Sequence, residues 1–151
     1  MTLDKIDQFR GDFFFLSNFY EAPVNYRGLT FPNNEAAFQA QKCLDPEEQQ
    51  RFTQLSPREA KHLGRQVALR PDWEKVKEQL MEEIVLAKFT QHPDLAALLM
   101  ATGDKLLIEG NRWNDRYWGV DLRSGTGKNR LGAILMKVRK RLREEAAEAG
   151  Q

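Results

Sequence analysis

The sequence has little of what a disulfide framework or a metal centre requires. It contains one cysteine, Cys43, and two histidines, His62 and His92, in 151 residues. A single cysteine cannot form an internal disulfide, and one cysteine with two histidines does not supply the ligand set of a structural zinc site. We therefore expect chemistry that uses no metal and no cofactor.

Strong net charge and long apolar runs are also lacking. Lysine and arginine number 23 against 22 aspartate and glutamate, so the formal net charge is +1. This balance gives no general argument for binding nucleic acid or an anionic membrane. No apolar run approaches the length of a transmembrane helix. The N-terminal residues 1–7 contain no apolar signal core, and we expect a cytoplasmic protein.

The patterns that are present indicate a mainly helical fold. Ser56-Pro57-Arg58-Glu59, for example, has the residues of a capping box with proline at the first helical position. Helical periodicity and stop signals predict helices over residues 34–43, 57–70, 73–92, 94–102 and 130–142, with a short helix or loop at 45–54. Alternation and turn residues predict a strand over 9–15, a hairpin over 24–31 turning at Arg27-Gly28, and a strand over 105–109.

We therefore predict one compact α-rich domain over residues 1–151, with about five to seven helices and a small N-terminal β element. Its core spans about residues 9–142. The charged segment 144–151 is expected to be a frayed end.

The predicted helix over residues 34–43 has an unusual polar face. Asn34 or Asn33 is a suitable N-cap, and Glu35, Gln39 and Lys42 then lie on one side of the helix together with Phe38. The remaining positions carry small side chains, which allow neighbouring backbone to come close. A charged face among small residues indicates either a lined site or a partly exposed helix end, and the helix alone does not decide between them.

The segment 110–128 is a second candidate site. It has no periodic pattern, and long structureless segments in compact domains are usually functional. It contains two tryptophans and a tyrosine, rings that often stack on ligands. Ser124-Gly125-Thr126-Gly127-Lys128 then leads to Asn129, the predicted N-cap of the last helix. Free amides, glycines and a lysine at a helix start suit a phosphate, although the spacing is not that of a Walker A loop.

An ordered set of short motifs resembles the NADAR (YbiA-like) family over roughly residues 9–142. The motifs are Ser17-Asn18-Phe19, Glu35 with Phe38-Gln39-Ala40-Gln41-Lys42, Gly64-Arg65, Arg70-Pro71-Asp72-Trp73, Lys88-Phe89, Gln91-His92-Pro93, Asn114-Asp115, Tyr117-Trp118-Gly119 and Gly127-Lys128-Asn129-Arg130-Leu131-Gly132. No single motif decides the matter, but their order and spacing are specific.

The resemblance implies an α-rich fold and an N-glycosidase, a hydrolase that cleaves the bond between ribose C1 and an amine nitrogen. The substrates it implies are phosphorylated ribosylamino-pyrimidine intermediates of riboflavin biosynthesis. The implied catalytic residues are Glu35, Lys42 and Asp115. The implied substrate-binding residues are Asn18, Phe19, Arg65, Trp73, Trp118, Gly119, Lys128 and Asn129.

Two other functions stay open at this point. The same chemistry acts in the family on ADP-ribose attached to guanine in nucleic acid, and a non-catalytic module would bind ADP-ribose or a nucleotide without turnover. The family pattern has threonine or serine before the glutamate and a histidine with an aromatic residue after it. Here Asn34, Ala36 and Ala37 occupy those positions. The sequence predicts neither a membrane partner nor an oligomeric state.

Overall fold

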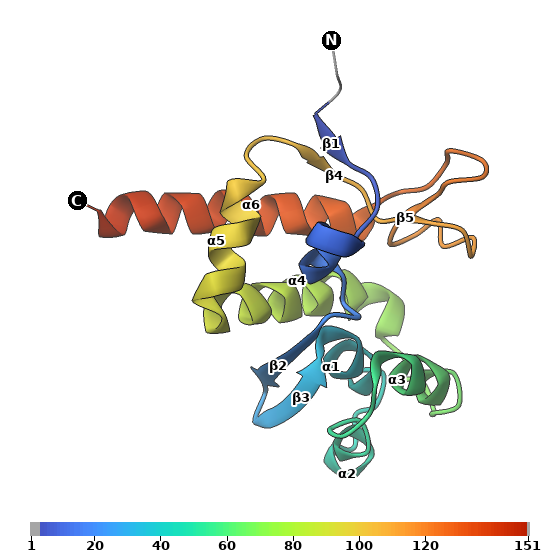
Figure 1. The fold of residues 1–151 in the computed structure, drawn as a ribbon. Coiled ribbons are helices and arrows are strands. Elements are labelled where there is room, and N and C mark those ends of the chain that lie inside the picture. The colour runs from blue at the N-terminus through green and yellow to red at the C-terminus, as the bar shows by residue number, and fades with distance from the viewer. Residues whose placement is uncertain (1–3, 151) are drawn as a thin grey trace. The chain divides into compact units, whose positions relative to one another are not determined.

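The computed structural model describes residues 4–150 and has a mainly helical architecture (Figure 1). Its helices are η1 (Gly11–Leu16, a 3-10 helix), α1 (Asn34–Ala40), α2 (Pro46–Gln50), α3 (Pro57–Gly64), α4 (Trp73–Gln91), α5 (Pro93–Ala101) and α6 (Arg130–Ala149). Its strands are β1 (Lys5–Ile6), β2 (Glu21–Tyr26), β3 (Leu29–Asn33), β4 (Leu106–Leu107), β5 (Gly110–Asn111) and β6 (Val120–Asp121).

The chain groups into two compact units. One comprises residues 18–91, and the other combines the N-terminal segment through Ser17 with the chain from His92 onward. The predicted α-rich fold class with a small β element is confirmed, whereas the single domain over residues 1–151 stays a prediction.

The unit of residues 18–91 is built on a β-hairpin that leads directly into α1. β2 and β3 pair antiparallel, with Val24 opposite Phe31, and both side chains are fully buried. The predicted turn is confirmed: Arg27 and Gly28 have φ values of 50° and 88°, as a two-residue hairpin turn requires. β3 ends at Asn33, and α1 begins at the next residue. The hairpin therefore fixes where α1 starts.

The other helices of this unit follow their local signals. The capping box of α3 is present, with the Ser56 side chain bonded to the Glu59 amide and the Glu59 side chain to the Ser56 amide. α4 extends from Trp73 to Gln91, and its buried residues include Leu80, Ile84 and Phe89. These spacings give one apolar face that packs within the protein.

The second unit is organised around α6. Leu131, Leu135 and Val138 are buried along one side of this helix. β1 pairs parallel with β4, and β5 pairs parallel with β6. α5 and α6 pack together in this unit (Figure 1). Each of these strands has 2 residues. The β1–β4 pair joins segments that are far apart in the sequence, whereas the β5–β6 pair closes a single loop.

Four sequence predictions of local structure need correction. The strand over residues 9–15 is wrong, because Gly11–Leu16 forms a 3-10 helix starting at a glycine with φ of 56°. The helix predicted over 57–70 ends at Gly64. The loop over 110–128 contains β5 and β6. The last helix continues to Ala149, whereas fraying of that end stays a prediction.

Among residues 4–150, no helix has both the length and the apolar content needed to cross a bilayer. In the same residues, no three His, Cys, Asp or Glu side chains are grouped so that they would hold a metal ion. Metal-free chemistry stays a prediction.

Lys88, in α4, is a lysine whose side chain is buried. Its side chain is 1% exposed, and its ammonium nitrogen lies 5.4 Å from the centre of the Tyr20 ring and 5.1 Å from that of Phe89. Burial lowers the pKa of Lys88 from 10.5 to about 7. Desolvation of the charged form causes this shift.

We expect Lys88→Met to abolish the rise in stability with pH that the lowered pKa of Lys88 produces, because methionine has no proton to bind. The folded protein binds this proton less tightly than the unfolded chain, so wild-type stability rises between pH values of about 7 and 10.5. The difference in the free energy of unfolding between variant and wild type should therefore move in favour of the wild type over that interval. Urea denaturation at a series of pH values measures it. Lys75→Met, at an exposed position of α4, is the matched control and should show no such trend.

Candidate functional site

The N-terminus of α1 is fixed by a buried asparagine. Asn33 is fully buried, and its side-chain oxygen accepts a hydrogen bond of 2.8 Å from the Ala36 amide. Its amide nitrogen donates to the Leu55 carbonyl at 3.1 Å. Of the two predicted N-caps, Asn33 is therefore the one that caps the helix, and it also anchors α1 to the segment before α3.

Asn18 supports the same turn of helix from the other side. Its backbone carbonyl accepts from the Glu35 amide at 3.1 Å. Its side-chain nitrogen donates to the Met81 sulfur at 3.4 Å, and its side-chain oxygen accepts from Asn34 at 3.5 Å. Asn18 was predicted to bind substrate. These contacts, with 7% exposure, support a role in positioning Glu35.

Glu35 and Gln39 form a buried pair along α1. The Gln39 Nε2 atom donates to Glu35 Oε2 at 2.7 Å, and the two residues are 7% and 9% exposed respectively. Gly64, the last residue of α3, lies against Gln39, since a Cβ built on Gly64 would stand 2.0 Å from Gln39 Oε1. The glycine therefore provides the space that the glutamine side chain occupies.

Lys42 lies just beyond α1 on the same face. α1 ends at Ala40, but the Lys42 amide still donates to the Gln39 carbonyl at 3.1 Å, so the turn continues. The ammonium donates to the Gly64 carbonyl at 3.3 Å. Burial, opposed by the Glu35 charge and assisted by that of Arg65, lowers the pKa of Lys42. A lysine with a lowered pKa offers more neutral amine for attack on carbon.

Two aromatic rings adjoin this face. Phe38 and Trp73 have centroids 5.1 Å apart, and the Lys42 ammonium is 5.9 Å from the Trp73 centroid. Trp73 is 6% exposed, so its ring packs beside Phe38 and offers little open surface on which a ligand could stack. Arg70 fixes the backbone at Lys42, because its amide donates to the Lys42 carbonyl at 2.9 Å. Its guanidinium donates to the Asp72 carboxylate at 2.6 Å.

The other predicted residues of this unit are more open to solvent. Phe19 is 36% exposed, and the Lys61 ammonium lies 5.9 Å from its ring centroid. Arg65, at the C-terminal cap of α3, is exposed, and its charge acts on Lys42. A cation and a ring therefore lie at accessible positions in the unit that contains Glu35.

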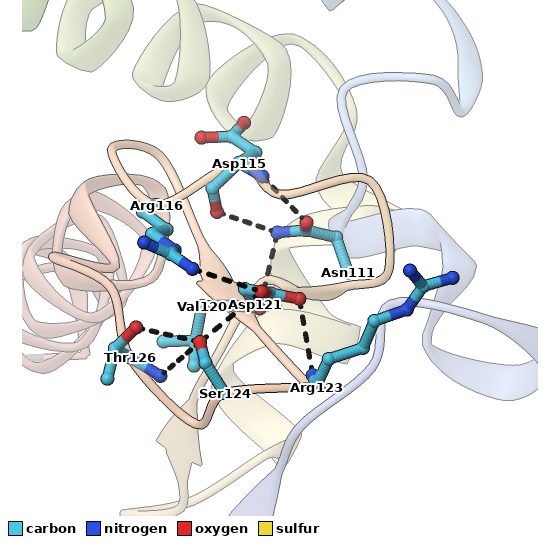
Figure 2. Close-up of polar contacts among 8 residues, drawn as sticks. All are labelled: Asn111, Asp115, Arg116, Val120, Asp121, Arg123, Ser124 and Thr126. Carbon is cyan, nitrogen blue, oxygen red and sulfur yellow. Dashed lines mark hydrogen bonds and ion pairs between the residues drawn. The ribbon is translucent and has the colours of Figure 1, made fainter.

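The loop in the other unit is organised by Asn111, which sequence reasoning missed. Figure 2 shows its amide among the strands of the loop. The nitrogen lies within hydrogen-bond distance of the backbone carbonyls of Asp115 at 2.9 Å and Val120 at 3.2 Å. The oxygen accepts from the Asp115 amide at 2.9 Å. With 1% exposure, this one side chain satisfies several loop groups that would otherwise be buried without partners.

Asp115, predicted to be catalytic, shapes the turn that follows it. Its Oδ1 atom accepts from the amides of Tyr117 and Trp118 at 3.1 and 2.9 Å. Gly119 is buried, and a Cβ there would stand 2.1 Å from the Glu109 carbonyl oxygen, so close packing requires glycine. Trp118 is half-buried, with its ring edge-on to Tyr117 at 4.9 Å. The structure supports structural roles for Asp115 and Gly119, and their part in catalysis or binding stays a prediction.

The predicted phosphate site at the start of α6 lacks the free amides on which the prediction depended. The amides of Lys128, Asn129, Arg130 and Leu131 donate to the carbonyls of Arg116, Gly119, Tyr117 and Trp118. The loop therefore occupies the donors that a phosphate would need. The Lys128 side chain is exposed, with its ammonium 5.5 Å from the Tyr117 ring centroid.

Asn129 is the first residue before α6, but its side chain does not cap the helix. The residue has a left-handed backbone with φ of 51°. Its oxygen accepts from the Glu109 amide at 3.0 Å, and its nitrogen donates to the Leu107 carbonyl at 2.9 Å. Gly132 leaves room for this amide. Both side-chain atoms bind backbone groups of residues 107–109, which supports a structural role for Asn129, and its part in substrate binding stays a prediction.

The fold and the polar face of α1 describe a small, mainly helical protein with a buried carboxylate and a lysine on one face of α1 and the turn after it. The NADAR domain model matches residues 7–143 of the chain. The chain therefore belongs to the NADAR family.

Similar proteins agree with this assignment. N-glycosidase YbiA of Escherichia coli (strain K12) is 46% identical over 135 residues, which cover 87% of this chain and 81% of that protein. The NMR structure of E. coli YbiA superposes with a TM-score of 0.85 at 42% identity, covering 98% of this chain and 90% of the other. The riboflavin biosynthesis protein VVA0006 of Vibrio vulnificus is 38% identical over 135 residues, 87% of this chain and 36% of that longer protein.

Sequence reasoning placed Gln39 on the right face of α1 but did not count it among the site residues. The signal was present, because a glutamine four residues after a glutamate is in hydrogen-bond reach on a helix. Arg70 donates to the Gln41 carbonyl, 29 residues away, and Asn111 donates to the Val120 carbonyl, 9 residues away across the loop. A local sequence pattern does not predict such partners.

We expect Asn129→Ala to lower the free energy of unfolding by about 2–4 kcal/mol, because it removes two hydrogen bonds and places a Cβ at a left-handed position. Asn129→Gly should lose about 1 kcal/mol less, since glycine tolerates that backbone. The control is Asn114→Ala, at an exposed position with φ of 65°, which tests the backbone cost alone. Equal losses at both alanine variants, measured by urea denaturation, would contradict the bonding role of Asn129.

Proposed function

We propose that this protein hydrolyses the bond between ribose C1 and an amine nitrogen in phosphorylated ribosylamino-pyrimidine intermediates of riboflavin biosynthesis. The observation that carries the proposal is the arrangement on and after α1. A buried carboxylate, Glu35, is held by Gln39 at 2.7 Å, and an amine of lowered pKa, Lys42, follows on the same face.

The arrangement suits the reaction because cleavage of an N-glycosidic bond develops positive charge on C1 and on the ring oxygen. A carboxylate close to C1 stabilises that charge or accepts a proton from the attacking water. Glu35 is buried, and its amide is bonded to Asn18, so its helical backbone is fixed before substrate arrives. A charge held in place in this way costs little reorganisation during the reaction.

Lys42 permits a second route through the ring-opened substrate. In that form C1 is joined to the pyrimidine nitrogen as an imine. The neutral Lys42 amine attacks C1, the pyrimidine leaves as its free amine, and water then releases the sugar and regenerates the lysine. The lowered pKa of Lys42 supports this route.

The names of the relatives support the reaction class and the substrate class. Proteins named N-glycosidase are 46% identical in E. coli and 37% identical in Nostoc punctiforme, and the Vibrio relative is named a riboflavin biosynthesis protein. These names favour catalysis over a module that only binds ADP-ribose. The proposed partner is thus a small nucleotide-like substrate.

Hydrolysis of ADP-ribosyl-guanine in nucleic acid is a second candidate, favoured by one observation. The loop through β5 and β6 exposes Arg112, Arg116, Arg123 and Lys128 together with Trp113, which is 63% exposed. Exposed cations and rings are the usual contacts to phosphates and bases. The near-zero net charge of the chain favours the small substrate.

Glu35→Gln should reduce turnover at least about 100-fold while the fold and substrate binding are retained, because an amide cannot carry the negative charge that opposes the developing cation. Release of free pyrimidine and ribose 5-phosphate is measured, with guanine-linked ADP-ribose as the parallel substrate. Glu47→Gln, an exposed change at the start of α2, is the control and should match wild type. Full activity of Glu35→Gln would remove Glu35 from the mechanism, and cleavage of the guanine adduct alone would select the second candidate.

Lys42→Met distinguishes the two routes. If the imine route operates, cyanoborohydride added during turnover should attach a reduced sugar phosphate to the peptide that contains Lys42, and Lys42→Met should abolish both labelling and activity. Mass spectrometry of the digested protein measures the labelling. The matched control is Lys61→Met, which changes a lysine of α3 in the same unit. This variant should still be labelled on the peptide that contains Lys42. An unlabelled wild type with a fully active Lys42→Met would contradict the imine route and leave direct hydrolysis.

A further inference from the structure

The hydrogen bond between Gln39 and Glu35 differs from the other glutamine–glutamate pair of the same spacing. The Gln79 side chain donates to Glu83, four residues later in α4, at 3.2 Å, and that pair is exposed. The Gln39–Glu35 bond is shorter, 2.7 Å, and buried. In a low-dielectric environment a donor aimed at a carboxylate has a larger effect than in water.

The other end of the Gln39 amide shows what determines its orientation. Among residues 4–150, Gln39 Oε1 is one of two buried side-chain oxygens without a hydrogen-bond partner. Turning the amide over would place this oxygen against the Glu35 carboxylate, oxygen to oxygen, and would remove the 2.7 Å bond. The side chain therefore leaves one acceptor unsatisfied, at a cost, and keeps its donor on Glu35.

Gly64 is the second part of the arrangement. The last turn of α3 brings its Cα so close that any Cβ would stand 2.0 Å from Gln39 Oε1 and 2.8 Å from Cδ. The backbone there is not left-handed, so turn conformation does not require glycine. The space for the Gln39 amide does.

We propose that Gln39, seated against Gly64, is a positioning residue that holds the Glu35 carboxylate in its ionised and correctly oriented form. The inference rests on the proposed function only in linking this carboxylate to turnover. An N–H donor forms a stronger hydrogen bond with an ionised carboxylate than with a neutral carboxylic acid. The bond from Gln39 therefore stabilises the ionised form of Glu35. Gln39 itself need not touch the substrate.

The test compares three variants. Gln39→Met keeps the length of the side chain and removes the donor. Gln39→Glu places a second carboxylate at the same distance, so that the two carboxylates share a proton. Gly64→Ala leaves both residues of the pair unchanged and displaces the amide by steric contact. The matched controls are Gln79→Met and Gln79→Glu on the exposed pair.

The first readout does not depend on activity. Carbon NMR of the side-chain carboxyl groups follows the titration of Glu35. We expect its midpoint to move to higher pH by at least about 1 unit in Gln39→Met, further in Gln39→Glu, and in the same direction in Gly64→Ala. The Gln79 variants should leave it unchanged. An unchanged Glu35 midpoint in folded Gln39→Met would overturn the inference.

The second readout links the carboxylate to turnover. The acid limb of the pH profile of kcat/KM should move to higher pH in Gln39→Met, with a loss of about tenfold near neutral pH. A merely structural role would lower activity equally at all pH values, and that result would contradict the inference. Wild-type inactivity on every riboside tested would instead reject the proposed function, while the NMR titration would still decide the role of Gln39.

Discussion

The cap that Asn33 forms on α1 is the interaction on which the polar face depends. Asn33 is the last residue of β3, and its side chain accepts from the Ala36 amide and donates to the Leu55 carbonyl. It thereby sets the first turn of a helix of only seven residues, too short to be stable alone. Glu35 is the second residue of this helix, so its place is fixed by β3 and by the segment before α3 rather than by helix propensity.

The same principle operates in the other unit, with asparagine again at the centre. Asn111 and Asn129 each use both ends of a side-chain amide on backbone groups of neighbouring segments. Irregular backbone can be buried only when its polar groups find partners. Two amide side chains thus supply partners that the ladder of a larger sheet would otherwise provide. The amides at the start of α6 are occupied separately, by backbone carbonyls of residues 116–119.

Much of the fold could be predicted because its signals are local. The turn at Arg27-Gly28, the capping box at Ser56 and the periodic faces of α4 and α6 involve residues within a few positions of one another. The strand predicted at residues 9–15 is wrong for a related reason. Its aromatic run satisfies β propensity, which is decided by packing rather than by the backbone, and a 3-10 helix buries Phe15 and Leu16 instead.

The candidate site could be predicted in outline but not in its contacts. The spacing of Glu35, Gln39 and Lys42 predicts that they share one face of a helix. That Gly64 makes room for Gln39, and that Arg70 binds the Lys42 carbonyl, depends on residues more than 20 positions away. Asn129 has the right type and place for an N-cap, yet its left-handed backbone directs the side chain to β4. Sequence spacing does not carry that information.

We propose that substrate binds at the polar face of α1. The most direct test is backbone NMR of the ¹⁵N-labelled protein titrated with the product ribose 5-phosphate. We expect the largest shifts at the amides of Glu35, Gln39, Lys42 and Gly64, with the amide of Gly150, near the end of α6, unaffected. Saturable shifts that leave those four amides unchanged would contradict it and would move the site elsewhere in the chain.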